Sequence, residues 1–291
     1  MNRAMVGGKR VTERAAVPGR FEDRVAIVTG GAAGIGRSIV EELCREGAKV
    51  AFTGISARGD AALKEMKGKG YPVIFIRGDM ADPEFCRHIV ARTLEEWGAV
   101  HYLVNNAFSF LGKGIDAERE DFIRSFTTGP IAYAAMAQQT LEPMKAAGGG
   151  AIVNMSSISG HIAQINRWTY NSAKGAVMML TKCQALDLAP YNIRVNSVSP
   201  AFIWSDVVYD IARLQGGDKD YFDPIWGQLH ILERCGEPVE CAGPVLFLLS
   251  DDASFITGTD LPIDGGYLAL GTEGLGKLTM NDVLEKENLG R

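Results

Sequence analysis

The fold is decided by the stretch Val25-Ala26-Ile27-Val28-Thr29-Gly30-Gly31-Ala32-Ala33-Gly34-Ile35-Gly36. It starts with an apolar run typical of a buried strand, and a helical pattern begins at its end. Between them the glycines let the backbone approach a ligand closely, and the N-terminus of the following helix stabilises negative charge. Tight packing without a ligand is the alternative interpretation. Because the turn follows the first strand, we expect a dinucleotide pyrophosphate there, bound by Gly30, Gly34, Ile35 and Gly36.

The same alternation of apolar strand and helix continues along the chain. The expected strands are residues 25–28, 49–53, 73–76, 102–104, 151–154, 194–198 and 260–264. The expected helices are residues 35–46, 83–97, 123–145, 169–188 and 239–249. Strands this apolar are buried on both faces, which predicts an α/β fold: a single doubly wound, Rossmann-like parallel sheet with helices on both sides.

The alternating pattern defines one domain, which we place at residues 21–267. Residues 1–20 are expected to form a flexible N-terminal arm, and residues 268–291 a C-terminal extension that covers the pocket or a neighbouring subunit. The interval 204–237 has no clear periodicity. An irregular segment of that length in a compact domain predicts a loop or lid over the substrate.

Composition excludes several classes of partner. The 291 residues are 46% hydrophobic and 22% charged, and the formal net charge of -5 gives no general attraction to nucleic acid. The five cysteines are widely spaced, without the pairing expected of a disulfide framework or a metal site. No apolar run reaches the roughly 20 residues of a membrane helix, and residues 1–20 lack the apolar stretch of a secretory signal. We expect a cytoplasmic protein with a small-molecule substrate, no metal, and neither nucleic acid nor membrane as partner.

Tyr170-Asn171-Ser172-Ala173-Lys174 carries the strongest chemical signal. On a helix it places a phenol and an ammonium one turn apart on the same face. A nearby cation lowers the pKa of a phenol from its usual value near ~10, so the pair suits acid/base work. The same spacing also arises by chance on a half-exposed helix. The glycine-rich turn and the upstream Ser157 favour the catalytic interpretation.

The end of the second strand bears on the choice of cofactor. A carboxylate there selects NAD, because it accepts from the ribose 2′-hydroxyl and repels a 2′-phosphate. Gly54-Ile55-Ser56-Ala57-Arg58 carries no acid. Its Ser56 hydroxyl and Arg58 guanidinium suit a phosphate, so the sequence favours NADP over NAD. A solvated surface charge is the alternative interpretation of Arg58.

These motifs together resemble the short-chain dehydrogenase/reductase family over residues 25–267. The shared set is TGxxxGIG, Asn105-Asn106-Ala107 after the fourth strand, a Ser before YxxxK, and a late Asp-Gly-Gly. The resemblance implies that Asp79 and Met80 lie at the adenine and that Asn106 and Ala107 lie beside the cofactor. It also implies that Ile203 and Ser205 contact the nicotinamide carboxamide.

The resemblance implies the catalytic roles as well. The family spacing between Ser and Tyr selects Ser157 rather than its neighbour Ser156. Tyr170 would exchange a proton with the substrate oxygen while a hydride moves between the substrate carbon and the nicotinamide. Lys174 would lower the Tyr170 pKa and bind the nicotinamide ribose, and Ser157 would hydrogen-bond the substrate oxygen.

The chain departs from the family pattern at three positions. Phe108 stands in place of a Gly, so with Phe110 it predicts a narrower, more apolar substrate pocket. Phe126 occupies the position of an Asn that holds a relay water, and neither Thr127 nor Thr128 is assigned to replace it. Ala201 replaces a Gly beside the cofactor. Trp204 and Trp226 of the lid are expected to form a substrate wall, which suits a sugar ring, a cyclic alcohol or a larger ketone.

Three functions remain open at this point. The first is an NAD(P)-dependent oxidoreductase acting on a secondary alcohol or ketone, which the intact Ser157, Tyr170 and Lys174 favour. The second is an enoyl or dienoyl thioester reductase. The third is a dinucleotide-binding sensor or scaffold without turnover, which Phe108 and Phe126 keep open. The family resemblance further implies a homotetramer packed through the helices at 123–145 and 169–188.

Overall fold

The computed structural model describes residues 9–271 and confirms the doubly wound α/β fold. Seven parallel strands form one sheet in the order β3-β2-β1-β4-β5-β6-β7. The strands are β1 (Val25–Val28), β2 (Lys49–Gly54), β3 (Val73–Arg77), β4 (Tyr102–Asn105), β5 (Gly150–Met155), β6 (Ile193–Pro200) and β7 (Asp260–Ile263). The order reverses between β1 and β4, and in open parallel sheets ligands bind at the carboxyl ends of the strands at that point.

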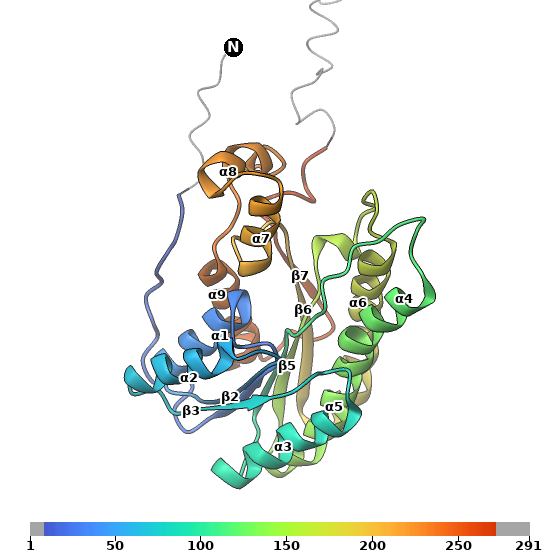
Figure 1. Ribbon diagram of the computed structural model, residues 1–291. Helices are drawn as coiled ribbons and strands as arrows, with labels where there is room; N and C mark the ends of the chain where they lie inside the picture. The colour runs from blue at the N-terminus through green and yellow to red at the C-terminus, as the bar shows by residue number, and fades with distance from the viewer. Residues whose placement is uncertain (1–8, 272–291) are drawn as a thin grey trace, which may run out of the picture.

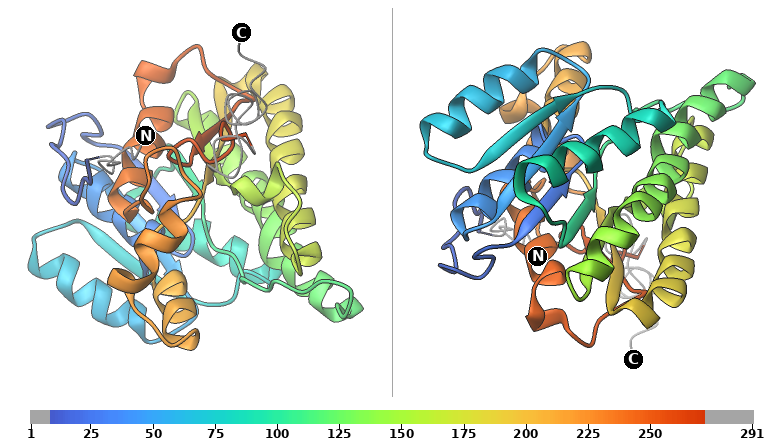
Figure 2. Two further views of the ribbon diagram at one scale, coloured as in Figure 1. Left: turned by 90° about the horizontal axis from the view of Figure 1, so that it is seen from above. Right: turned by 90° about the horizontal axis from the view of Figure 1, so that it is seen from below.

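Helices cover both faces of the sheet (Figures 1 and 2). The α-helices are α1 (Gly34–Arg45), α2 (Arg58–Gly68), α3 (Pro83–Trp97), α4 (Arg119–Phe126), α5 (Ala132–Ala146), α6 (Trp168–Leu188), α7 (Asp206–Leu214), α8 (Lys219–Gly227) and α9 (Pro238–Leu249). Shorter turns are η1 (Thr127–Ile131), η2 (Ile158–Gly160), η3 (Ala189–Tyr191) and η4 (Asp251–Ala253). In Figure 2, α5 and α6 lie on the face opposite α1 and α9.

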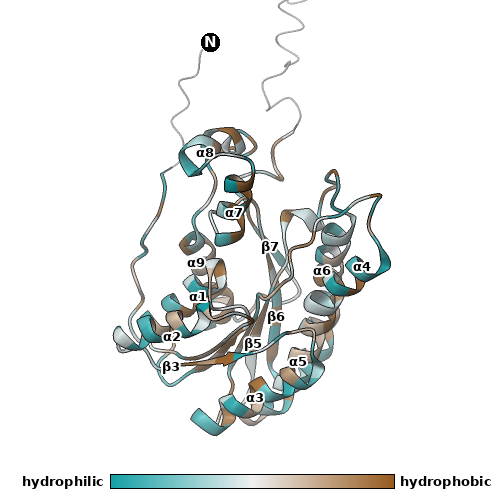
Figure 3. Ribbon diagram, in the orientation of Figure 1, coloured by the Kyte–Doolittle hydropathy of each residue, from teal (hydrophilic) through white to brown (hydrophobic). Residues whose placement is uncertain are grey.

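Two hydrophobic cores follow from this layering. One joins the sheet to α1, α2 and α9, and the other joins it to α3, α5 and α6. All four residues of β1 and of β4 are buried, as expected for strands packed on both faces. Figure 3 shows hydrophilic residues on parts of the outer helices α3 and α4. Packing on both faces of the sheet thus fixes the positions of the carboxyl ends of β1 and β4.

Two helical segments in the first half of the chain differ from the sequence expectation. The helix α2 was not expected, because its buried residues are only Gly59, Ala62 and Met66 and its apolar stripe is short. The expected helix at 123–145 is divided into α4 and α5 by the π-helical turn η1, where Gly129 has φ -105° and ψ -111°. Glycine tolerates this backbone conformation, and Pro130 follows it directly.

The segment expected as an irregular loop at 204–237 contains the helices α7 and α8. Figure 1 shows both at one end of the molecule, above the sheet. Asp218 caps α8 by accepting from the Tyr221 backbone N–H at 3.0 Å. A separate aromatic cluster, built on Trp204 and Phe222, anchors the segment. The lid is thus a small packed unit.

The described part of the N-terminal arm, residues 9–20, lies against the body, whereas a flexible arm was expected. Arg14 and Arg20 both bind Glu46 of the turn after α1, at 2.6 Å each, and Glu46 is fully buried. Arg14 also binds Glu42 at 2.9 Å. Within the described part of the chain, no helix is both long and apolar enough to cross a bilayer. The C-terminal extension expected at 268–291 lies outside the described residues from 272 onward.

Candidate active site

A cleft of about 610 Å³ opens at the carboxyl ends of β1 and β4, a volume typical of ligand sites. Most of the site residues expected from the sequence line it. They are Gly30, Gly34, Ile35, Gly36, Ser56, Arg58, Asp79, Met80, Asn106, Ala107, Phe108, Phe110, Ser157, Tyr170, Lys174, Ile203 and Ser205. The cleft therefore runs from the start of α2 past the glycine-rich turn to α6.

The glycine-rich turn needs its glycines for two separate reasons. Gly30 and Gly34 have φ of 67° and 54°, in the left-handed region that favours glycine. Gly36 has no room for a side chain, because a Cβ there would lie 2.3 Å from the carbonyl oxygen of Gly30. Asn106 Nδ2 braces the turn by donating to the carbonyls of Thr29 and Gly30 at 3.0 and 3.1 Å. The resulting backbone cradle fits a pyrophosphate at the N-terminus of α1.

The adenosine end of the cleft is polar and open. Arg58 is the first residue of α2, and its backbone N–H lies 3.4 Å from the Ser56 hydroxyl. Within residues 9–271, Arg58 has no carboxylate within ion-pair distance, whereas nearby Arg77 pairs with Asp60. Asp79, expected at the adenine, lines the cleft but binds Arg124 of α4 at 2.8 Å. This end therefore combines an exposed cation with a carboxylate that is already paired.

At the opposite end, the structure brings Ser157, Tyr170 and Lys174 together. Ser157 lies at the end of β5, where its Oγ accepts from the Ser159 backbone N–H at 3.1 Å. The Ser157 hydroxyl also lies close enough to Tyr170 of α6 to act on the pKa of its phenol. Lys174, one turn further along α6, is 2% exposed and donates from Nζ to the Met155 carbonyl at 2.7 Å. Two hydroxyls thus meet at the end of the cleft with an amine behind them.

Aromatic rings surround this group. The Phe108 ring packs edge-on against Tyr170 with centroids 5.3 Å apart, and the Phe110 ring lies at 4.8 Å. Lys174 Nζ lies 4.1 Å from the Phe108 ring centroid, within cation–π range. A Cβ at Gly129 would lie 2.6 Å from Phe108 Cε2, so η1 makes room for the ring. The Phe at position 108 is therefore accommodated by a glycine in a distant element.

Burial shifts the pKa of both titratable groups toward their neutral forms. Burial raises the pKa of Tyr170 above its ordinary value, although the nearby Ser157 hydroxyl and the charge of Arg167 oppose the rise. Burial lowers the pKa of Lys174 to about 7. The sequence interpretation had Lys174 lowering the Tyr170 pKa, and this structure does not show that effect. The reason is that a buried ammonium is itself costly, so Lys174 holds its proton weakly.

The structure corrects the substrate wall expected from Trp204 and Trp226, because neither lines the cleft. Successive side chains of an extended segment point to opposite sides, so Ile203 and Ser205 face the cleft and Trp204 faces away. Trp204 is 2% exposed and donates from Nε1 to Asp223 at 2.5 Å. Trp226 stacks on the rings of Phe222, Trp204 and Phe202. Both tryptophans hold the lid together from behind.

Other residues of the cleft were missed from the sequence. They are Val207, Val208 and Ile211 of α7, Gln164 and Arg167 before α6, and Arg124 and Thr128 near η1. The apolar spacing of Val207, Val208 and Ile211 is helical and was a usable signal for α7. Thr128, which was left unassigned as a relay residue, donates from Oγ1 to the Arg124 carbonyl at 2.9 Å and accepts from the Ser109 N–H.

Comparison with known proteins places the chain among oxidoreductases. A family model described as enoyl-(acyl carrier protein) reductase matches residues 30–268. A cyclopentanol dehydrogenase of Comamonas testosteroni is 36% identical over 253 residues, which cover 86% of this chain and 99% of the relative.

Two further matches extend this result. An NADP-dependent (R)-specific alcohol dehydrogenase of Lentilactobacillus kefiri is 34% identical over 255 residues, covering 86% of this chain and 98% of the relative. The ligand-free structure of an aldohexose dehydrogenase of Thermoplasma acidophilum superimposes with a TM-score of 0.80 at 32% identity, covering 88% of this chain and 98% of the other. Fold, cleft and sequence therefore point to one family.

Proposed function

Since the chain belongs to the short-chain dehydrogenase/reductase family, we propose that it interconverts a cyclic secondary alcohol and its ketone. Members of this family are NAD(P)-dependent oxidoreductases, and the two relatives described above are named as alcohol dehydrogenases, which act on CH–OH groups. The observation that carries the proposal is the position of Ser157 and Tyr170 together at the end of the cleft, close enough for the Ser157 hydroxyl to act on the pKa of Tyr170. Two hydroxyls at one point suit a single substrate oxygen, which each can contact. Lys174 lies directly behind them.

The mechanism assigns a separate task to each residue. A bound nicotinamide dinucleotide supplies the hydride chemistry. Tyr170 exchanges a proton with the substrate oxygen, giving it during reduction and taking it during oxidation. Ser157 donates a hydrogen bond to the same oxygen and fixes its position. Lys174 holds its Nζ behind the two hydroxyls by donating to the Met155 carbonyl, where it can bind the ribose hydroxyls of the dinucleotide.

The walls of the cleft support a ring-shaped apolar substrate. Phe108 and Phe110 flank Tyr170, and Val208 and Ile211 of α7 contribute further apolar lining. A hydrocarbon ring buries its surface well against such walls, and the relative from Comamonas is named for a cyclic alcohol. A hexose has hydroxyls around its ring and would instead need polar partners such as Gln164 and Arg167, which also line the cleft.

The cofactor we propose is NADP rather than NAD. The guanidinium of Arg58 and the hydroxyl of Ser56 line the adenosine end, and the end of β2 is Gly54, which carries no charge. A 2′-phosphate would therefore meet a cation and no repelling carboxylate at this position. The relative from Lentilactobacillus is named as NADP-dependent.

Reduction of an enoyl thioester is the second candidate, because the matching family model carries that description. The paired hydroxyls of Ser157 and Tyr170 favour carbonyl chemistry instead, since both can bind the oxygen that changes its bond order. The two reactions differ in which bond receives the hydride, and a direct assay separates them.

The assay incubates the purified protein with NADP⁺ or NAD⁺ and, in turn, cyclopentanol, cyclohexanol, a linear secondary alcohol and glucose. NADPH with an enoyl thioester completes the panel, and nicotinamide absorbance reports turnover. We expect the cyclic alcohols with NADP⁺ to react fastest. Faster reaction of the enoyl thioester would replace the proposal with the second candidate, and faster reaction of glucose would reject the apolar ring.

The homotetramer expected from the family remains a proposal. Apolar side chains of Ile131, at the end of η1, and of Met179 and Leu186 on α6 are 56%, 59% and 76% exposed, which supports packing of copies through α5 and α6. Light scattering on a sizing column measures the mass directly. A monomer at micromolar concentration would reject this arrangement.

A further inference from the structure

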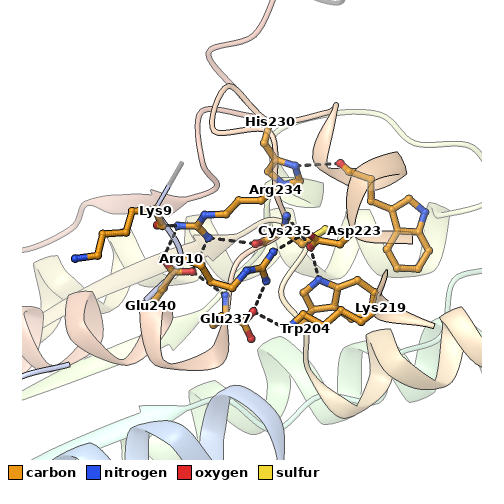
Figure 4. A network of polar contacts seen from close by, with 11 residues as sticks. Lys9, Arg10, Trp204, Lys219, Asp223, His230, Arg234, Cys235, Glu237 and Glu240 are labelled. Atoms are coloured by element: carbon orange, nitrogen blue, oxygen red, sulfur yellow. Dashed lines mark hydrogen bonds and ion pairs between the residues drawn. The ribbon is translucent and has the colours of Figure 1, made fainter. Parts of the chain in front are cut away.

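Arg10 of the N-terminal arm takes part in an ion-pair network with residues of the lid, which Figure 4 shows from close by. The guanidinium of Arg10 binds Asp223 of α8 through Nη2 at 2.5 Å and Glu237 through Nη1. Glu237 is the N-cap of α9, so Arg10 joins the lid to the first turn of a core helix. The side chains of Asp223 and Glu237 are only 18% and 11% exposed, so their charges are poorly solvated.

Asp223 is the centre of this network. Its Oδ1 accepts from Trp204 Nε1 at 2.5 Å and from the Cys235 backbone N–H at 3.3 Å, while Oδ2 binds Arg10. These contacts come from both ends of the lid, since Trp204 begins the segment and Cys235 lies close to its end. Asp223 therefore fixes the two ends to α8, and Arg10 holds Asp223.

The network reaches the cleft through the backbone around Trp204. The Trp204 N–H donates to the Gly236 carbonyl at 2.9 Å, and the Gly236 N–H donates to the Phe202 carbonyl at 2.8 Å. Ile203 and Ser205, on either side of Trp204, line the cleft. Ser205 also lies against the glycine-rich turn, because a Cβ at Gly34 would be 3.2 Å from Ser205 Cβ. A shift of Trp204 would therefore move the part of the cleft wall that faces the turn.

Charge balance makes Arg10 important in this network. Lys219 also binds Glu237, at 2.6 Å, but it makes no ion pair with Asp223 among the described residues. Without Arg10, the Asp223 carboxylate keeps only its two N–H donors and loses its cationic partner. Removing one partner of a poorly solvated ion pair destabilises a protein by more than the intact pair stabilises it. Opening of the lid would then expose the Asp223 carboxylate to water and restore its solvation.

We propose that Arg10 of the N-terminal arm is a positioning residue for the cleft, which holds the segment 204–237 in its closed arrangement through Asp223 and Trp204. Arg10 contacts neither substrate nor cofactor. The link to cofactor binding rests on the proposed function, but the link to the lid does not. The arm offers a matched control, because Arg14 binds Glu42 and Glu46 and, among the described residues, makes no ion pair with Asp223 or Glu237.

The experiment compares amide hydrogen exchange in the full-length wild type, Arg10→Ala, Arg10→Lys and Arg14→Ala. In Arg10→Ala we expect exchange within residues 204–237 to rise about tenfold, with α3 and α5 unchanged. Arg10→Lys should restore part of the protection, because a lysine binds one of the two carboxylates well but lacks the planar fork. Arg14→Ala should leave the lid unchanged. Equal exchange of the lid in Arg10→Ala and wild type, or an equal rise in Arg14→Ala, overturns the proposal.

Cofactor binding gives the second measurement, by NADPH fluorescence titration. We expect Arg10→Ala to raise the NADPH Kd about tenfold and Arg14→Ala to leave it within about twofold. A wild type that binds no dinucleotide would reject the proposed function, while the exchange data would still decide the role of Arg10. Faster lid exchange with an unchanged Kd would overturn the link from lid to cleft.

Discussion

The two ends of the cleft are built in different ways. At the adenosine end, the ligand surface is mostly backbone: a glycine-rich turn, the start of α2 and an exposed guanidinium at Arg58. At the catalytic end, it is made of buried and half-buried side chains that contact one another across β5, α6, η1 and the loop after β4. The Phe108 ring lies there against Gly129, Tyr170 and Lys174.

This difference decides how each end responds to substitution. A backbone cradle depends on local conformation, so a change to one exposed side chain should affect one ligand group only. Buried side chains share their neighbours, and substitutions of residues in contact are not additive. We therefore expect large, coupled effects at the catalytic end and small, separable effects at the adenosine end.

The largest effect is expected from Tyr170→Phe. Loss of the phenolic proton should lower kcat about 10³-fold, within the usual range for a general acid/base, with the NADPH Kd nearly unchanged. Steady-state rates on the preferred alcohol and a fluorescence titration measure the two quantities. Tyr133→Phe is the matched control, because Tyr133 is a buried tyrosine close to Lys174 whose hydroxyl lies 3.4 Å from the Met155 carbonyl. Its rate should stay within about threefold. Retained turnover in Tyr170→Phe would contradict the proton-transfer role.

The second effect concerns pH and stability at Lys174. Its pKa is lowered from 10.5 to about 7 in the folded protein, so the unfolded chain binds the extra proton between these values. Stability from this group is therefore fully present above pH 10.5 and is lost as pH falls through about 7. Between pH 9 and pH 6 the loss should be about 3 kcal/mol.

Lys174→Met tests this by removing the titration. Urea unfolding of wild type and variant at pH 6 and pH 9 gives four free energies of unfolding, and the variant should lose the wild-type difference while also losing turnover. Lys182→Met is the control, because Lys182 lies on the same helix α6 but its side chain is exposed. A wild-type difference that persists in Lys174→Met would show that the slope comes from other groups.

The third effect tests coupling between Phe108 and Gly129. Gly129→Ala should destabilise the wild type by about 2 kcal/mol, because the new methyl group meets the Phe108 ring and overpacks a filled site. In a Phe108→Gly background the same substitution should cost clearly less, since the ring is gone. Thermal unfolding of the four proteins completes the double-mutant cycle. Equal costs in both backgrounds would mean that the non-helical backbone conformation of Gly129, and not the ring, sets the effect.

The sequence predicted the adenosine end and the sheet well because their signals are local. The boundaries expected for β1 and for α3 match the structure, and the other expected strands differ by one or two residues at their ends. Gly36 is required by a contact with Gly30 only a few residues away. The helix α2 was missed because its residues are mostly polar. The helix α8 is shorter than the windows that show periodicity, and α7 is equally short, so that its only signal was the spacing of three apolar residues.

The catalytic end could be predicted only as a list of residues. Nothing in the sequence around Phe108 indicates that its ring fits against Gly129, which follows twenty-one positions later in η1. The direction of the Trp204 side chain likewise depends on Asp223 and the cluster behind the lid. Such features come from tertiary packing, which sequence periodicity does not encode.

The smallest effect, and the sharpest test of a separable adenosine end, is expected from Arg58→Ala. The variant should bind NADPH about tenfold more weakly, because one charge-assisted contact to the 2′-phosphate is lost, and should bind NADH as before. Arg77→Ala is the control, since Arg77 lies nearby but pairs with Asp60. Titration of each protein with both dinucleotides measures the ratio. If Arg58→Ala weakened the binding of both dinucleotides equally, the Arg58 side chain would be stabilising the start of α2 rather than binding the phosphate. Substitutions at the adenosine end would then be as strongly coupled as those at the catalytic end.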